Sequence, residues 1–78
     1  MEQPMNPQGT RFEYGTIEWM WDQGKIRINL SGNREFKQQG TYNEVVALLN
    51  QLGAEGWGVA SCVAAGNWLF WTLHRPYA

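Results

Sequence analysis

The first third of the chain alternates between apolar and polar residues in a way typical of a β-hairpin. Residues 25–31 alternate strictly, with Ile or Leu at every second position and Arg27 and Asn29 between them. The preceding stretch, 11–21, is rich in aromatic and branched residues and contains no proline, which favours a strand. Gly24 lies between the two stretches and can adopt the positive φ of a tight turn. We expect two antiparallel strands here.

The pattern then changes from a period of two to a helical period. Residues 32–40 are polar, charged and bounded by glycines, which predicts a loop. Thr41 and Glu44 have the spacing of a capping box at a helix start, and Gly53 or Gly56 is suited to its end. Between these signals, apolar residues at three- and four-residue spacing predict an amphipathic helix: Val45, Leu48, Leu49 and Leu52.

Two further strands complete the predicted fold. They cover residues 57–64 and 68–75, are joined by a short turn, and end at Pro76. The order ββαββ predicts an α+β fold, in which one helix packs on one face of an antiparallel sheet. Residues 1–10 contain two prolines and a glycine and are predicted to form a flexible N-terminal tail, which leaves a single domain at 11–78.

The first and fourth strands are predicted to be apolar on both faces. In the fourth strand, for example, Trp68 and Phe70 point opposite to Trp71 and Leu73. One helix covers only one face of a sheet, and an exposed apolar face of this size is uncommon on a stable monomer. We therefore expect the second face to be covered by another copy of the chain, by a ligand or by a partner protein.

Chain length points in the same direction. A single core in 78 residues supplies only about 3–5 kcal/mol of stability unless a further constraint is added. One cysteine and one histidine exclude an intramolecular disulfide and the usual zinc sites within one chain, so we expect no metal. Self-association is the remaining constraint, and we expect a homo-oligomer.

Charge and hydropathy narrow the classes of partner. The formal net charge of −1 argues against steering towards duplex nucleic acid or an anionic membrane. No apolar run approaches the roughly 20 residues that span a bilayer. The first residues show no basic segment followed by an apolar one, so no signal peptide is indicated, and a cytoplasmic protein is expected.

The segment Leu49-Asn50-Gln51-Leu52-Gly53-Ala54-Glu55-Gly56-Trp57 resembles the signature of the DUF4177 family of small bacterial and phage proteins. An early Phe12-Glu13-Tyr14 and a closing His74-Arg75-Pro76 are similar to that family's flanking motifs, although Gly58 stands where the family commonly has a glutamate. The resemblance covers residues 11–76. It implies the ββαββ order and a cytosolic, non-enzymatic protein, in a family of unassigned function. The central segment is expected to be a helix-to-strand hinge, with a ligand site at Glu55 and Trp57 as the alternative.

The residues do not favour catalysis. Gly58, Ala60, Cys62 and Ala64 are predicted to form a row of small residues on one face of the third strand. Cys62 is therefore expected to be an inert buried thiol, opposite Leu69 or Phe70 in the neighbouring strand rather than His74. The carboxylates are scattered, and no phosphate-binding glycine loop is present. We expect no enzymatic activity, no catalytic residues and no cofactor.

Binding is the better-supported class of function. Tryptophan rings stack on planar ligands, and arginines bind phosphates or carboxylates. The candidate ligand-binding residues are Trp19, Trp21, Arg27, Arg34, Trp68, Trp71 and Arg75. For any single tryptophan, a place in the core or in a dimer interface is the simpler expectation. Arg34 and Lys37 lie in the predicted loop, where they either close over a bound anion or are part of a solvated linker.

We expect a nucleotide-like small molecule as the ligand, by analogy with small phage proteins that sequester cyclic-nucleotide signals. The competing hypothesis is a protein–protein adaptor whose second sheet face is wholly interface. A third hypothesis is binding of single-stranded nucleic acid, but the near-zero net charge disfavours it.

Overall fold

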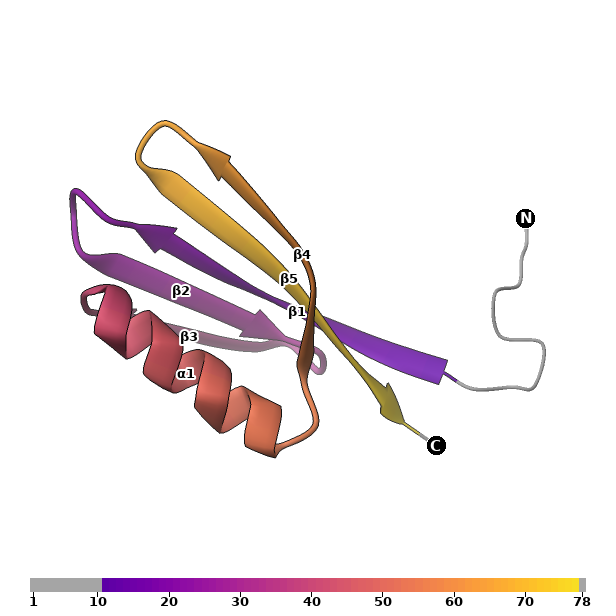
Figure 1. Ribbon diagram of the computed structural model, residues 1–78. Coiled ribbons are helices and arrows are strands. Elements are labelled where there is room, and N and C mark those ends of the chain that lie inside the picture. Colours follow the sequence, from indigo (N-terminus) through magenta and orange to yellow (C-terminus); the bar gives the residue numbers. More distant parts are fainter. Residues whose placement is uncertain (1–10, 78) are drawn as a thin grey trace.

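The computed structural model describes residues 11–77, which form one antiparallel five-stranded sheet with a single helix on one face (Figure 1). The elements are β1 (Arg11–Met20), β2 (Lys25–Leu30), β3 (Arg34–Gln39), α1 (Tyr42–Ala54), β4 (Gly58–Ala65) and β5 (Trp68–Tyr77). The strand order is β3-β2-β1-β5-β4, so strands from the two ends of the described chain pair at the centre of the sheet. The predicted α+β fold is confirmed, and the predicted tail, 1–10, lies outside the described residues.

The prediction of a loop at residues 32–40 is wrong, because this segment contains β3. Gly32 and Asn33 have φ values of 83° and 61°, and two left-handed residues make the turn that fits the twist of a hairpin. Phe36, the only apolar residue of β3, pairs with Ile28 of β2. The strand was not apparent in the sequence because every residue of β3 is exposed at the sheet edge, where no apolar alternation is required.

Strand β5 continues through Pro76, contrary to the predicted stop. Pro76 pairs with Phe12 of β1, while the pairing of β5 with β4 already ends at the pair His74–Gly58. Because no β4 residue lies beside Pro76, its missing amide hydrogen costs no hydrogen bond on that side of the strand. Proline is therefore compatible with a position that the sequence pattern marked as the end of the strand.

An irregularity in β4 breaks the predicted row of small residues. Gly58 pairs with His74 and Cys62 pairs with Trp71, with a register shift between Val59 and Ser61. His74 and Trp71 are three positions apart in β5 and therefore point to opposite faces. Gly58 and Cys62 consequently lie on opposite faces as well, and the four small residues do not form one surface.

The hydrophobic core lies between α1 and the face of the sheet that the helix covers. Its buried members come from four strands or their flanks and from the helix: Ile17, Ile26, Ile28, Val45, Leu52, Trp57, Trp71 and Leu73. The predicted capping box is present, and the Thr41 amide donates a 2.7 Å hydrogen bond to the Glu44 carboxylate. Gly56, with a φ of 99°, reverses the chain after α1 and delivers Trp57 to the core.

Gly15 allows a close approach between β1 and the end of β2. A Cβ atom at this position would lie 2.8 Å from Leu30 Cδ2 and 2.9 Å from the Asn29 carbonyl oxygen. Both distances are shorter than any normal contact, and a carbonyl oxygen of the backbone cannot rotate away as a side chain can. Leu30 therefore packs directly over the glycine, which is why a glycine stands in the middle of a strand.

Gly15→Ala is expected to lower the free energy of unfolding by about 1–3 kcal/mol, because the added methyl group forces backbone and side chain apart. Gly53→Ala is the matched control: it lies near the end of α1, and a Cβ there would meet nothing within 4 Å. This variant is expected to be neutral or stabilising by up to about 1 kcal/mol. Urea denaturation measures both changes, and equal stability of the two variants would contradict the close approach at Gly15.

Candidate ligand-binding face of the sheet

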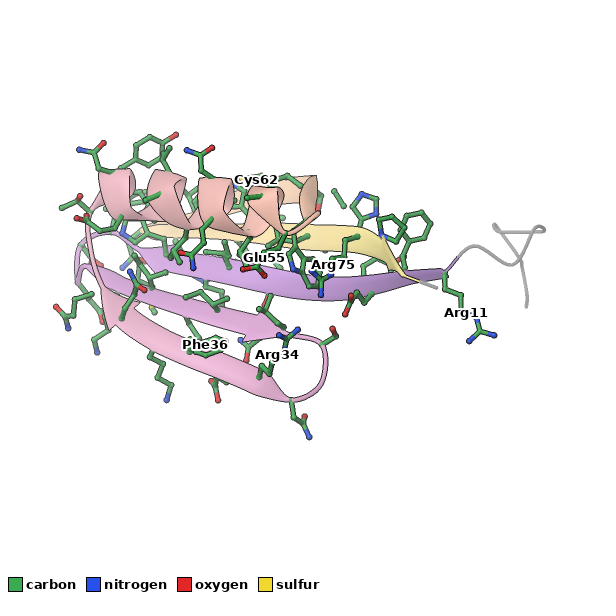
Figure 2. All side chains as sticks on the ribbon, turned by 90° about the horizontal axis from the view of Figure 1, so that it is seen from below. Arg11, Arg34, Phe36, Glu55, Cys62 and Arg75 are labelled. Atoms are coloured by element: carbon green, nitrogen blue, oxygen red, sulfur yellow. The ribbon has the colours of Figure 1, made fainter. Side chains whose placement is uncertain are left out.

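The face of the sheet opposite α1 has no covering element among residues 11–77 (Figure 2). Alternation along the strands decides which side chains it carries, because the buried residues Ile17, Trp71 and Leu73 occupy the helix side. Their neighbours along each strand point the other way. The open face, as we call it, carries these residues on its two central strands: Phe12, Tyr14, Thr16, Glu18, Met20, Trp68, Phe70, Thr72 and His74.

Glu18 connects an aromatic and a basic residue on the open face. The Trp68 indole N–H donates a 3.2 Å hydrogen bond to Glu18 Oε1, and Arg27 Nη1 lies 4.0 Å from Glu18 Oε2. The three residues belong to three neighbouring strands, β5, β1 and β2. Glu18 thus orients the indole, while the Arg27 side chain remains 44% exposed and able to contact a ligand.

Two lysines extend the basic part of this face. Lys37 of β3 is the direct cross-strand partner of Arg27, and Lys25 lies two residues from Arg27 on the same face of β2. A hollow of about 360 Å³ is lined by Met20, Lys25, Ile26, Arg27, Lys37, Gln38 and Gln39. On β1, β2 and β3, the carboxylates that point to the open face are Glu18 and Glu35. The three basic side chains outnumber them, so the open face has a positive charge beside its aromatic rings.

Two aromatic clusters lie on the open face. Trp68 and Phe70 have ring centroids 5.3 Å apart in a tilted arrangement, beside the basic residues. His74 stacks on Phe12 at 5.1 Å and on Tyr14 at 6.3 Å, further towards the end of the sheet that contains both termini of the described chain. Only the first cluster has basic side chains next to it, and we take it as the candidate site.

Of the seven residues predicted to bind a ligand, the structure brings Trp68 and Arg27 together. Trp71 is 8% exposed and belongs to the core, and Trp19 packs beside it and donates its indole N–H to the Gly40 carbonyl at 3.2 Å. Trp21 follows β1 in the turn, is 44% exposed, and contacts Trp19 edge to face. These three tryptophans therefore lie away from the Trp68 site.

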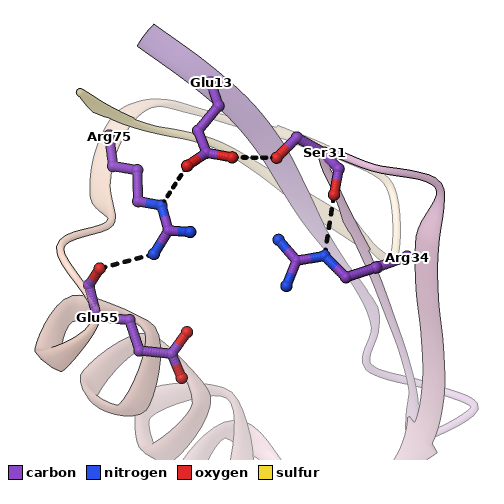
Figure 3. A network of polar contacts seen from close by, with 5 residues as sticks. All are labelled: Glu13, Ser31, Arg34, Glu55 and Arg75. Carbon is purple, nitrogen blue, oxygen red and sulfur yellow. Dashed lines mark hydrogen bonds and ion pairs between the residues drawn. The ribbon is translucent and has the colours of Figure 1, made fainter. Parts of the chain in front are cut away.

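Arg75 and Arg34 lie on the helix side, in a polar network around Glu13 (Figure 3). Arg75 donates to the Glu13 carboxylate at 2.6 Å and to the Glu55 carbonyl at 2.8 Å, and its guanidinium lies 4.6 Å from the centre of the Trp57 ring. The Ser31 hydroxyl also donates to Glu13, and Arg34 donates to the Ser31 carbonyl at 2.9 Å. This network holds the end of α1, β5, β1 and the β2–β3 turn together.

Sequence reasoning missed Glu18, Lys25 and Phe70 as parts of the site. Lys25 shares the alternation of Arg27, so that signal was available in the sequence. Lys37 is expected from the sequence as a possible anion contact in a loop, and the structure places it instead on β3, opposite Arg27. Glu18 was not apparent because its role depends on pairing between β1, β2 and β5, which bring it beside Arg27 and Trp68.

Cys62 and His74 are not placed to act together. The prediction of a buried thiol is wrong, because Cys62 is exposed at the sheet edge, where α1 does not cover β4. It pairs with Trp71, one position beyond the predicted Leu69 or Phe70, and points to the helix side, whereas His74 is on the open face. Among the described residues, no three His, Cys, Asp or Glu side chains gather as a metal site.

Comparison with known protein families, curated proteins and solved structures finds no match for this chain. The resemblance to DUF4177 therefore stays a prediction. The only helix in residues 11–77, α1, is too short to cross a membrane.

Glu13 makes the stability of the fold sensitive to acid. Hydrogen bonds from Ser31 and then Arg75 hold the pKa of this carboxyl below its ordinary value of 4.5. A lowered pKa in the folded state means that the ionised carboxylate stabilises the fold above pH 4.5, and that this stabilisation is lost as the pH falls through the lowered pKa.

Glu13→Gln is accordingly expected to reduce the free energy of unfolding at about pH 7, with a difference from the unsubstituted protein that shrinks as the pH falls below the ordinary carboxyl value. Urea denaturation across the acid range measures it. Glu35→Gln, on the exposed edge strand β3, is the matched control and is expected to leave the acid dependence unchanged. A constant difference between Glu13→Gln and the unsubstituted protein at every pH would contradict the role of the charge.

Proposed function

We propose that this chain is a non-enzymatic, homo-oligomeric cytoplasmic protein whose open face binds a small, planar, anionic molecule of the nucleotide class. The observation that carries the proposal is the cluster in which Glu18 joins Trp68 to Arg27, with Lys25 and Lys37 alongside. An aromatic ring offers a stacking surface for a base, and cations on the neighbouring strands suit a phosphate.

The local geometry favours a small ligand over a long polymer. The basic residues occupy one hairpin, β2–β3, and the Trp68–Phe70 pair lies two strands away, across Glu18. Stacking on one aromatic pair and pairing with a few cations suits a single nucleotide unit. Single-strand grooves that bind without sequence preference are strongly basic along their length, whereas this chain has a net charge of −1.

The competing hypothesis is an adaptor in which the open face contacts another protein. Its support is the second aromatic cluster, Phe12, Tyr14 and His74, because no Lys or Arg is among the direct cross-strand partners of these residues. Arg75 follows His74 in β5 but points to the other face. Tyr14 is 54% exposed, and such a side chain suits an interface. The two hypotheses use different ends of the same face and differ in what they bind.

Titration with a panel of mononucleotides and cyclic dinucleotides, followed by the indole N–H signals in an NMR spectrum, tests the proposal. Binding of one nucleotide class is expected to shift the Trp68 signal most. Trp68→Ala is expected to weaken that binding roughly 5- to 150-fold, the equivalent of about 1–3 kcal/mol for one stacked base. Arg27→Ala is expected to weaken it about tenfold or more, through loss of a charge-assisted contact.

Arg34→Ala is the matched control, since Arg34 lies on the helix side of the sheet and its loss is expected to leave nucleotide affinity unchanged. Equal weakening by Arg34→Ala and Arg27→Ala would place the ligand elsewhere. Absence of any shift across the whole panel would contradict nucleotide binding and leave the adaptor hypothesis.

A further inference from the structure

Strand β4 lies at one edge of the sheet, with β5 on one side and no strand on the other among the described residues (Figure 1). All eight of its residues, Gly58–Ala65, are exposed. An edge strand presents a row of unpaired main-chain N–H and C=O groups, which is a ready template for another strand.

From Ser61 to Ala65, the β4 edge lacks the features that normally prevent such pairing. Natural sheets protect their edges with charged residues, proline or bulges. No Asp, Glu, Lys or Arg occurs between Gly56 and Leu73, and β4 contains no proline. Its one irregularity lies between Val59 and Ser61, which leaves Ser61–Ala65 as a regular segment. The opposite edge, β3, differs because three of its six residues are charged.

Apolar side chains are exposed on both sides of the β4 backbone. Val59 is 51% exposed and pairs with Leu73 on the helix side, whereas Val63 is 54% exposed and pairs with Phe70 on the open face. The helix does not reach this edge of the sheet (Figure 1). A partner strand beside β4 would therefore bury apolar surface on both faces as well as satisfy the main-chain groups.

We propose that a second copy of this chain pairs with the β4 edge, antiparallel and across a two-fold axis, so that two five-stranded sheets become one continuous sheet. Antiparallel pairing is self-complementary, as a two-fold interface requires. Because the stretch from Gly56 to Leu73 carries no charge, two identical edges can meet without repulsion between like charges. A charged partner protein would find no opposite charge on this edge, so the edge suits a second copy of the chain better.

The dimer specifies the homo-oligomer of the proposed function, and it rests on that self-association and not on the ligand. With the axis perpendicular to the sheet, both helices lie on one side and both open faces on the other. The Trp68 sites of the two copies then face the same direction and remain uncovered. Ligand binding and self-association therefore use different surfaces and can be tested separately.

Sedimentation of the full chain at micromolar concentration is expected to show a dimer. Cys62 lies next to Val63, the middle residue of the regular segment, and is exposed. It points to the side away from Trp68, so substitutions there test the interface alone. Cys62→Lys places like charges close together in the dimer and is expected to raise the dimer dissociation constant about tenfold or more. Cys62→Thr, uncharged and suited to a strand, is the matched control and is expected to dimerise.

A nitroxide label on Cys62, the only cysteine in the chain, gives a second measurement. Neighbouring strands lie about 5 Å apart, so labels in the β4-to-β4 dimer are expected to show strong dipolar broadening. A monomeric protein, a dimer that tolerates Cys62→Lys, or a dimer with distant labels would each overturn the proposal. Nucleotide titration of Cys62→Lys keeps the two proposals distinguishable, because monomeric protein is expected to retain the shift of the Trp68 signal.

Discussion

Pairing between β1 and β5 is the interaction on which the rest of the fold depends. It runs through ten consecutive residue pairs, from Arg11 with Tyr77 to Met20 with Trp68. β2 and β3 attach to one side of this pair and β4 to the other. The helix α1 packs on a sheet surface that includes Ile17 of β1 and Trp71 and Leu73 of β5. This surface is complete only when both strands are paired. The paired residues are 48 to 66 positions apart in the chain, so this pairing joins its two ends and makes the fold one cooperative unit.

The alternation of side chains in β1 and β5 decides whether a tryptophan in these strands points to the core or to the open face. Trp68 and Trp71 are three residues apart in the same strand, yet one lies on the open face beside Glu18 and the other in the core. The sequence shows both faces to be apolar and predicts one helix, and from these facts the exposed second face follows. What the alternation alone cannot tell is which face the helix covers, because both carry aromatic rings. That choice depends on which sheet face packs against Val45 and Leu52 of α1.

The sequence was informative where local chemistry determines structure, and less so where a residue's role depends on distant strands. The hairpin β1–β2, the helix with its capping box, and the hairpin β4–β5 all follow from period and turn residues. Strand β3 has one apolar side chain, so its pairing with β2 left no periodic signal. Residue type alone predicts Arg75 to be a ligand contact like Arg27, whereas its pairing with Glu13 and its position over Trp57 make it part of the architecture.

The different lengths of the strands divide the open face in two. Pairing of β2 with β1 begins only at Thr16, and pairing of β4 with β5 ends at His74, so beyond these points the sheet narrows to two strands. Two-stranded ribbons twist more strongly than wider sheets. Phe12, Tyr14 and His74 lie where the sheet narrows, and Trp68 and Phe70 lie on its wide part. Although all five rings are on one side of the backbone, the surface rotates between them, so a rigid flat molecule that lies on one group is inclined away from the other.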